Sequence, residues 1–229
     1  MISVEMKRAE LRKWSEGETF FRRAWYELLR RPVALTAILA FQVRYSGREN
    51  IPSKGGVLVV SNHQSHLDPP LIGLGCPRQM NYLARRSLFA FAPFRWLIAS
   101  LGAIPIDLEG SGIDGLKESL RRLRRGEMLL VFPEGTRTYD GRIAPFRPGF
   151  TTLAVRSQAA ILPAAIDGAF AAWPRRRRFP RPGRIAVHYG KPIFPHEFAA
   201  YNQRELLAEV ERRVRECSAH LAAYRKRLS

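Results

Sequence analysis

Short aliphatic runs that end abruptly in polar residues constrain this sequence more than any other feature. Residues 57–60 read Val-Leu-Val-Val, and residues 128–131 read Met-Leu-Leu-Val. Runs of this kind, bounded by glycine and polar residues, are typical of buried strands. Segments with helical spacing, such as residues 111–125 and 203–225, follow or separate these runs. Because strands alternate with helices, we expect one α/β domain with a mixed β-sheet flanked by helices.

The remaining elements are assigned from the same patterns. Further strands are expected at residues 42–46, 80–84, 160–166 and 185–189, the first of them at a sheet edge. Further helices are expected at residues 71–74, 89–101 and 150–156. No internal repeat interrupts this alternation.

The first aliphatic run leads into a polar stretch that holds a candidate catalytic pair. His63 and Asp68 stand five residues apart, whereas neighbours on one helix face stand at i+3 or i+4. A turn from strand into helix would fold the carboxylate back onto the imidazole and leave the other ring nitrogen able to take a proton. Alternatively, Asp68 only caps a helix that begins with proline. The stretch therefore predicts either a dyad that activates a hydroxyl or a helix cap.

The second run leads into residues 132–137, which read Phe-Pro-Glu-Gly-Thr-Arg. Glycine beside threonine and arginine at a strand end suits a loop whose backbone amides and guanidinium hold an anionic oxygen or a phosphate. Candidate functional residues thus follow two of the expected strands. In α/β folds, ligand-binding and catalytic sites lie at the carboxyl ends of the strands.

Together the two stretches resemble the motifs of the PlsC-type glycerolipid acyltransferases, the lysophosphatidate acyltransferase family. Residues 62–68 match Asn-His-x-x-x-x-Asp, residues 132–137 match Phe-Pro-Glu-Gly-Thr-Arg, and the resemblance runs over residues 47–193. It implies a glycerol-3-phosphate acyltransferase-like fold and transfer of a fatty acyl group from acyl-CoA or acyl carrier protein. The acceptor would be the hydroxyl of 1-acyl-glycerol-3-phosphate, giving phosphatidic acid, with His63 as general base and Asp68 as its partner.

The resemblance also implies residues that bind the acceptor. Those of the second motif are Glu134, Gly135, Thr136 and Arg137. Where the family usually carries a lysine-containing stretch, this chain has Arg85 and Arg86, for which the alternative is a merely solvated pair. Leu108 stands where the family commonly has a phosphate-binding arginine. The alternative acceptor is therefore a lysolipid that lacks a phosphate monoester.

The charge of the chain predicts an anionic partner. The formal net charge is +18 and the sequence pI is about 11.0, which suits nucleic acid, an anionic membrane or phosphate-bearing substrates. Residues 174–184 contain six arginines and three prolines, so we expect an exposed basic loop. It could meet an anionic leaflet, coenzyme A or acyl carrier protein. A nucleic-acid-binding protein is the alternative from another class, suggested by charge alone, since no recognition-motif signature or zinc spacing accompanies it.

The first 45 residues are expected to form a helical membrane-association segment, ahead of an acyltransferase domain at residues 46–229. Aromatic residues and arginines at helical spacing over residues 17–30 precede an apolar stretch, residues 32–41. This pattern suits an interfacial segment or a pair of helices packed on the core.

The location of the protein is predicted from what this sequence lacks. The apolar stretch at residues 32–43 is 12 residues long, whereas a spanning helix needs about 20. Residues 1–17 have no apolar core of a secretory signal. Cys76 and Cys217 show no metal-ligand or disulfide spacing. We therefore expect a peripheral protein on the cytoplasmic face of a membrane, with no metal and no cofactor besides the acyl-thioester co-substrate.

Overall fold

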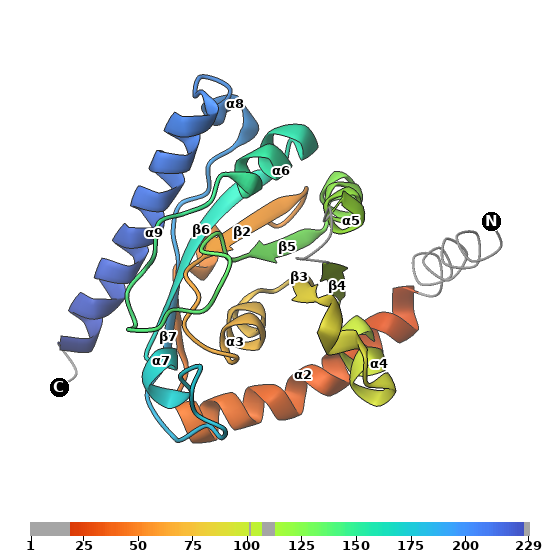
Figure 1. Ribbon diagram of the computed structural model, residues 1–229, viewed down its shortest axis with the longest axis vertical. Helices are drawn as coiled ribbons and strands as arrows, with labels where there is room; N and C mark the ends of the chain where they lie inside the picture. Colours follow the sequence, from red (N-terminus) through yellow and green to blue (C-terminus); the bar gives the residue numbers. More distant parts are fainter. Residues whose placement is uncertain (1–18, 101, 107–112, 227–229) are drawn as a thin grey trace.

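A mixed β-sheet with helices on both faces organises the computed structural model, which describes residues 19–100, 102–106 and 113–226 (Figure 1). Within these residues the sheet has seven strands in the order β1-β7-β6-β2-β5-β3-β4. Their bounds are β1 Arg44–Ser46, β2 Val57–Ser61, β3 Met80–Arg85, β4 Ala103–Ile106, β5 Met128–Val131, β6 Ala160–Asp167 and β7 Ala186–Tyr189. Strands β6, β2, β5, β3 and β4 run parallel, whereas β7 is antiparallel to β6 and parallel to β1. The expected mixed sheet and the edge position of β1 are confirmed.

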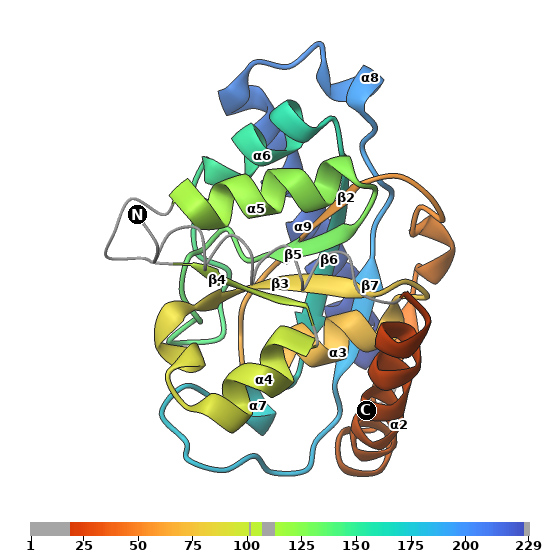
Figure 2. The ribbon, with the colours of Figure 1, turned by 90° about the vertical axis from the view of Figure 1, so that its right-hand side faces the viewer.

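The helices form two layers around this sheet (Figures 1 and 2). The described helices are α2 Thr19–Phe41, α3 Asp68–Gly75, α4 Ala92–Ser100, α5 Ile113–Arg124, α6 Gly149–Ser157, α7 Ala169–Ala172, α8 Pro195–Phe198 and α9 Gln203–Lys226. Two short 3-10 helices add Arg48–Asn50 and Arg86–Phe89. Residues of α2, α3 and α7 pack on one face of the sheet, and residues of α5, α6, α8 and α9 pack on the other.

The central strands are buried on both faces, which explains their unbroken apolar runs. Along β2, Val57 and Val59 join the core cluster under α3, while Leu58 and Val60 join the opposite cluster. All four side chains are completely buried. Helices on both faces are therefore required by the sequence of this strand, since neither face can meet water.

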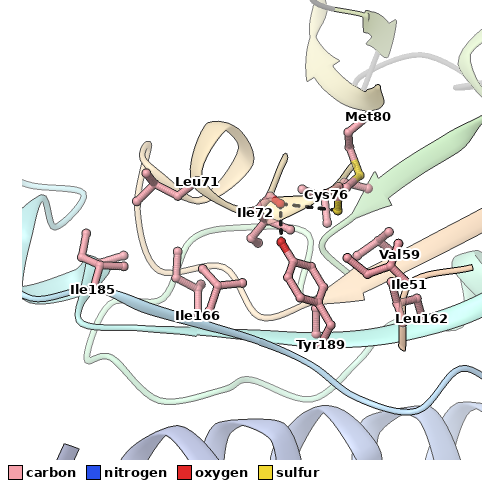
Figure 3. Packing of buried hydrophobic residues seen from close by; sticks show 14 of the residues in the cluster. Ile51, Val59, Leu71, Ile72, Cys76, Met80, Leu162, Ile166, Ile185 and Tyr189 are labelled. Carbon is pink, nitrogen blue, oxygen red and sulfur yellow. Dashed lines mark hydrogen bonds between the residues drawn. The ribbon is translucent and has the colours of Figure 1, made fainter. Parts of the chain in front are cut away.

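Helix α3 is fixed to the sheet by polar as well as apolar contacts (Figure 3). The buried hydroxyl of Tyr189, on β7, donates a hydrogen bond to the carbonyl of Ile72. The thiol of Cys76 donates to the same carbonyl, with 3.6 Å between sulfur and oxygen. Leu71 and Ile72 fill the space between helix and sheet. This matters for the site, because α3 begins at Asp68.

One long helix, α2, replaces the pair of helices that the sequence suggested. Proline lacks the N–H of a helical hydrogen bond, yet Pro32 lies inside α2 and does not end it. The guanidinium of Arg30 bonds the carbonyls of Leu74 and Cys76 at 2.8 and 3.0 Å, which ties α2 to the end of α3. With Phe41 also buried, tertiary contacts on both sides of the proline hold the helix together.

Helix α2 also exposes large apolar side chains to solvent. These are Leu28, Val33, Leu35, Ile38 and Leu39, and the polar residues Arg31 and Thr36 are exposed among them. None of the helices in the described residues is both long and apolar enough to span a membrane. The expected boundary between residues 45 and 46 falls inside β1. Residues 1–18, on which the expectation about a signal segment rests, lie outside the described part of the chain.

Candidate active site

The carboxyl ends of two adjacent strands bring the two motifs together. Strands β2 and β5 are parallel, with Val60 paired to Val131. His63 and Glu134 therefore emerge at the same edge of the sheet. The backbone N–H of His63 donates to Glu134 Oε1 at 2.6 Å, and its carbonyl accepts from the N–H of Thr138 at 2.8 Å. The loop after β5 thus holds His63 through both of its backbone groups.

His63 and Asp68 form the dyad geometry that the spacing suggested. The distance from His63 Nδ1 to Asp68 Oδ2 is 2.8 Å. The same carboxylate oxygen accepts the backbone N–H groups of Gln64 and Ser65. Asp68 is also the first residue of α3, where the helix dipole favours a negative charge. Leu67, not Asp68, occupies the cap position of α3, and the Asp68 carboxylate bonds only residues that precede the helix. Of the two alternatives for Asp68, the structure therefore shows the contact with the imidazole and not the helix cap.

The ring of His63 is held on its face as well as its edge. It stacks on Phe132 with ring centroids 3.9 Å apart and an interplanar angle of 12°. Its side chain is 19% exposed, so that solvent and substrate can reach it. A proton on Nδ1, donated to the carboxylate, assigns the lone pair to Nε2. Nε2 has no hydrogen-bond partner in the described part of the chain.

Both carboxylates of the site are buried, and this shifts their pKa values. Burial raises the pKa of Asp68, against the hydrogen bonds and charge of His63 and the N–H groups of Ser65 and Gln64. Burial likewise raises the pKa of Glu134, against the N–H groups of Ala144 and His63. The hydrogen bonds therefore favour two charges that the apolar surroundings disfavour.

Glu134 has a positioning role in this structure. Its Oε1 accepts from His63, its Oε2 accepts from the N–H of Ala144 at 2.8 Å, and its side chain is nearly inaccessible. The expectation that Glu134 contacts the acceptor stays untested. Asn62, to which no role was assigned from the sequence, acts similarly, since its amide bonds both backbone groups of Ile166 at 3.0 and 2.9 Å. Only the position of Asn62 in the motif could have indicated this.

The rest of the second motif faces a set of arginines. Gly135 has a φ of +74°, and a side chain there would meet the Arg147 guanidinium at 3.2 Å. Thr136 Oγ1 accepts a hydrogen bond from Arg175 at 3.1 Å. Burial lowers the pKa of His66, and the positive charge of Arg137 lowers it further. Sequence reasoning missed Arg147 and Arg175, because neither lies in a motif.

The other expected acceptor residues lie at the end of the neighbouring strand and directly after it. Tyr82 of β3 pairs with Leu130 of β5, so the end of β3 lies at the same edge as the motif loops. Arg85 ends this strand, and Arg86 is exposed at the start of the next 3-10 helix. Leu108 lies outside the described residues. The fold thus brings Arg86 to the correct edge without showing its contact with a ligand.

Among the described residues, Ser65 and the two cysteines are too buried to act as nucleophiles beside the dyad. Ser65 is fully buried, donates to the carbonyl of Trp173 at 2.8 Å and accepts from the N–H of Leu67. Both cysteines are buried, and burial raises the pKa of Cys76 and of Cys217 to about 11. Within the described residues no group of three His, Cys, Asp or Glu side chains could hold a metal ion.

Known proteins resemble this chain in sequence. Residues 42–167 match the acyltransferase family. The chain is 29% identical over 178 residues to a 1-acyl-sn-glycerol-3-phosphate acyltransferase of Bacillus subtilis, covering 76% of this chain and 86% of that protein. It is 32% identical over 206 residues to one of Pseudomonas aeruginosa, covering 85% and 76%.

A solved structure agrees with these sequence relatives. The crystal structure of the 1-acyl-sn-glycerophosphate acyltransferase PlsC from Thermotoga maritima matches with a TM-score of 0.77 at 27% identity, over 96% of this chain and 89% of that one. By motifs, fold and relatives, the chain belongs to the acyltransferase family, as the PlsC-type resemblance predicted.

Proposed function

We propose that this enzyme transfers a fatty acyl group from an acyl thioester to the free hydroxyl of 1-acyl-sn-glycerol-3-phosphate, giving phosphatidic acid. The observation that carries the proposal is the His63–Asp68 pair, 2.8 Å apart and clamped by the second motif at the carboxyl edge of the sheet. The names of the relatives in Bacillus subtilis and Pseudomonas aeruginosa support the same acceptor.

The geometry suits general-base catalysis of a direct transfer. His63 Nε2 takes the proton of the acceptor hydroxyl as its oxygen attacks the thioester carbonyl. Asp68 stabilises the imidazolium that forms. The tetrahedral intermediate then collapses, the C–S bond breaks, and the imidazolium returns the proton to the departing thiolate. Such base catalysis contributes about 10²–10⁴ in rate, and positioning of the two substrates supplies much of the remainder.

Direct attack by the acceptor is favoured by the absence of a suitable enzyme nucleophile among the described residues. Ser65, the hydroxyl that lies nearest to His63 in the sequence of the motif, has both its donor and acceptor functions occupied by the backbone. A lipid hydroxyl that reaches Nε2 meets no such competition. The thioester donor can be acyl-CoA or acyl carrier protein, since both present a phosphate-bearing group to a basic surface.

Membrane association is part of the proposal, because the acceptor is a lipid. The part of α2 with exposed apolar side chains adjoins the basic loop, residues 174–184, through a hydrogen bond from Gly183 N–H to the Ala40 carbonyl at 3.1 Å. Figures 1 and 2 both place this loop beside the carboxyl end of α2. Phe179 in the loop and Phe91 beside α4 are also exposed.

Apolar and basic groups side by side suit a peripheral protein on an anionic leaflet. Each arginine near such a surface contributes about 1 kcal/mol, and exposed apolar side chains add burial in the interface. We therefore propose that the enzyme binds the cytoplasmic face of a membrane without crossing it, with α2 and the basic loop toward the lipid.

The test is release of free thiol from a long-chain acyl-CoA by the purified full chain in detergent micelles, with lysophosphatidate as acceptor. We expect release that depends on the acceptor, phosphatidic acid as product, and a loss of about 10²-fold or more in His63→Ala. Wild-type protein that is silent with lysophosphatidate, with other lysolipids and with acyl carrier protein as donor would overturn the proposal.

A further inference from the structure

The start of the basic loop is fastened to the turn that carries the dyad. The hydroxyl of Ser65 donates to the carbonyl of Trp173 at 2.8 Å. The rings of His66 and Trp173 lie 5.2 Å apart at 48°. The indole N–H of Trp173 in turn donates to the carbonyl of Arg177 at 3.0 Å. The first residues of this exposed loop are therefore held against the catalytic turn rather than extended into solvent.

Arg175 reaches from this anchored segment to the second motif. Its Nη1 donates to Thr136 Oγ1 at 3.1 Å and to the hydroxyl of Tyr139 at 2.8 Å. Its guanidinium carbon lies 4.9 Å from the centre of the Tyr139 ring. Two hydrogen bonds and a cation–π contact thus fix the position of an arginine that is exposed to solvent.

The other edge of this guanidinium is available to a ligand. Both hydrogens of Nη1 are used by Thr136 and Tyr139, whereas Nε and Nη2 make no hydrogen bond within the described residues. The Nε–Nη2 edge presents two parallel N–H groups, which match two oxygens of a phosphate. Thr136 directly precedes Arg137 and follows Glu134 by two residues, so this edge lies beside the loop that clamps His63.

We propose that Arg175 binds the phosphate monoester of the acceptor and sets the preference for it over a lysophosphodiester. This inference rests on the proposed function. It also accounts for Leu108, which stands where the family commonly has a phosphate-binding arginine, because Arg175 brings a cation from the basic loop to the second motif. A dianionic monoester gains more from such a charge than a singly charged diester does.

The experiment compares Arg175→Gln with Arg142→Gln. Arg142 is a highly exposed arginine near the same loop, paired with Asp140 at 3.8 Å, so both variants lose one positive charge. For Arg175→Gln we expect the KM for lysophosphatidate to rise about tenfold, as for a lost charge-assisted bond. The KM for lysophosphatidylglycerol and both kcat values should change less than about twofold. Arg142→Gln should resemble the wild type.

The pH dependence of KM separates binding from a structural role. The second pKa of a phosphate monoester is about 6. The wild-type KM for lysophosphatidate should therefore fall as the pH rises through that value, and the fall should be shallower in Arg175→Gln. Arg175→Lys should recover part of the preference, because it keeps the charge but loses the fork. Equal losses on both acceptors, or identical behaviour of Arg175→Gln and Arg142→Gln, would overturn the proposal.

A binding titration distinguishes this proposal from the function on which it rests. Lysophosphatidate is titrated below its micelle concentration into the full chain, without an acyl donor. Arg175-dependent binding without any transfer would support the phosphate site and count against the proposed reaction. Transfer with binding that does not depend on Arg175 would overturn the site and leave the reaction standing.

Discussion

The turn that carries His63 and Asp68 and the basic loop of residues 174–184 are neighbours that are held in different ways. The turn is largely buried, and one carboxylate oxygen of Asp68 accepts three hydrogen bonds. The loop is exposed and is held through Arg175, Arg181 and Gly183 and through Trp173, the residue before it. Chemistry needs the fixed geometry of the first region, whereas binding to a charged surface tolerates the adaptability of the second.

The largest effect is expected from breaking the turn. Asp68→Ala removes the acceptor for His63 Nδ1 and for the N–H groups of Gln64 and Ser65. We expect kcat for acceptor-dependent thiol release to fall by about 10²–10⁴. Asp68→Asn is the matched control, because its amide oxygen can occupy the Oδ2 position and keep the ring orientation while removing the charge. Its loss should be clearly smaller, and an alanine variant as active as the wild type would contradict the role of the turn.

Membrane binding by the basic loop is tested by removing charges from loop arginines that do not contact either motif. A triple change, Arg176→Gln, Arg177→Gln and Arg178→Gln, should weaken binding to anionic vesicles by about 10²-fold, at about 1 kcal/mol per arginine. The loss should shrink as salt increases. Sedimentation with vesicles measures it, and neutral vesicles are the control. If kcat in neutral detergent micelles also fell by about 10²-fold, the loop would be needed for the geometry of the turn that carries His63 and Asp68, and not only for membrane binding.

A smaller effect is expected from Glu134→Gln. Glutamine has nearly the size of glutamate, but it changes the hydrogen bonds through which Glu134 holds the backbone of His63 and Ala144. Both carboxylate oxygens accept a backbone N–H, and glutamine can replace only one of these acceptors. We expect kcat to fall about tenfold and the free energy of unfolding to fall by about 1–3 kcal/mol. Urea denaturation and initial rates measure both. Glu216→Gln on the exposed side of α9 is the control, and equal values for the two variants would contradict the clamp.

The smallest effect concerns stability against pH. Burial raises the pKa of Asp68, so the folded state holds this proton more firmly than the unfolded state. The contribution of Asp68 is then fully present at low pH and is lost as the pH rises through its folded-state pKa. Relative to wild type, Asp68→Asn should gain stability as the pH rises above about 4, the ordinary pKa of an aspartate side chain. Parallel stability curves for the two proteins would contradict the direction of the shift.

The sequence allowed the strands and the dyad to be predicted because their signals are local. The aliphatic run of β2 and the spacing of His63 and Asp68 both lie within a few residues of chain. The bonds from Asn62 to Ile166 and from Arg175 to Thr136 depend on strand order and loop placement, which no local pattern specifies. The single helix α2, where a pair of helices was one alternative, also depends on distant contacts, since Arg30 bonds the end of another helix.

The most direct test of the central claim, that His63 activates the acceptor for direct attack, is the mass of the protein after incubation with an acyl thioester and no acceptor. Thiol release is followed in the same sample. We predict an unchanged mass and release that begins only when lysophosphatidate is added, because Ser65, Cys76 and Cys217 are all buried. An acyl adduct that forms on the protein beforehand and is then passed to the acceptor would contradict this mechanism.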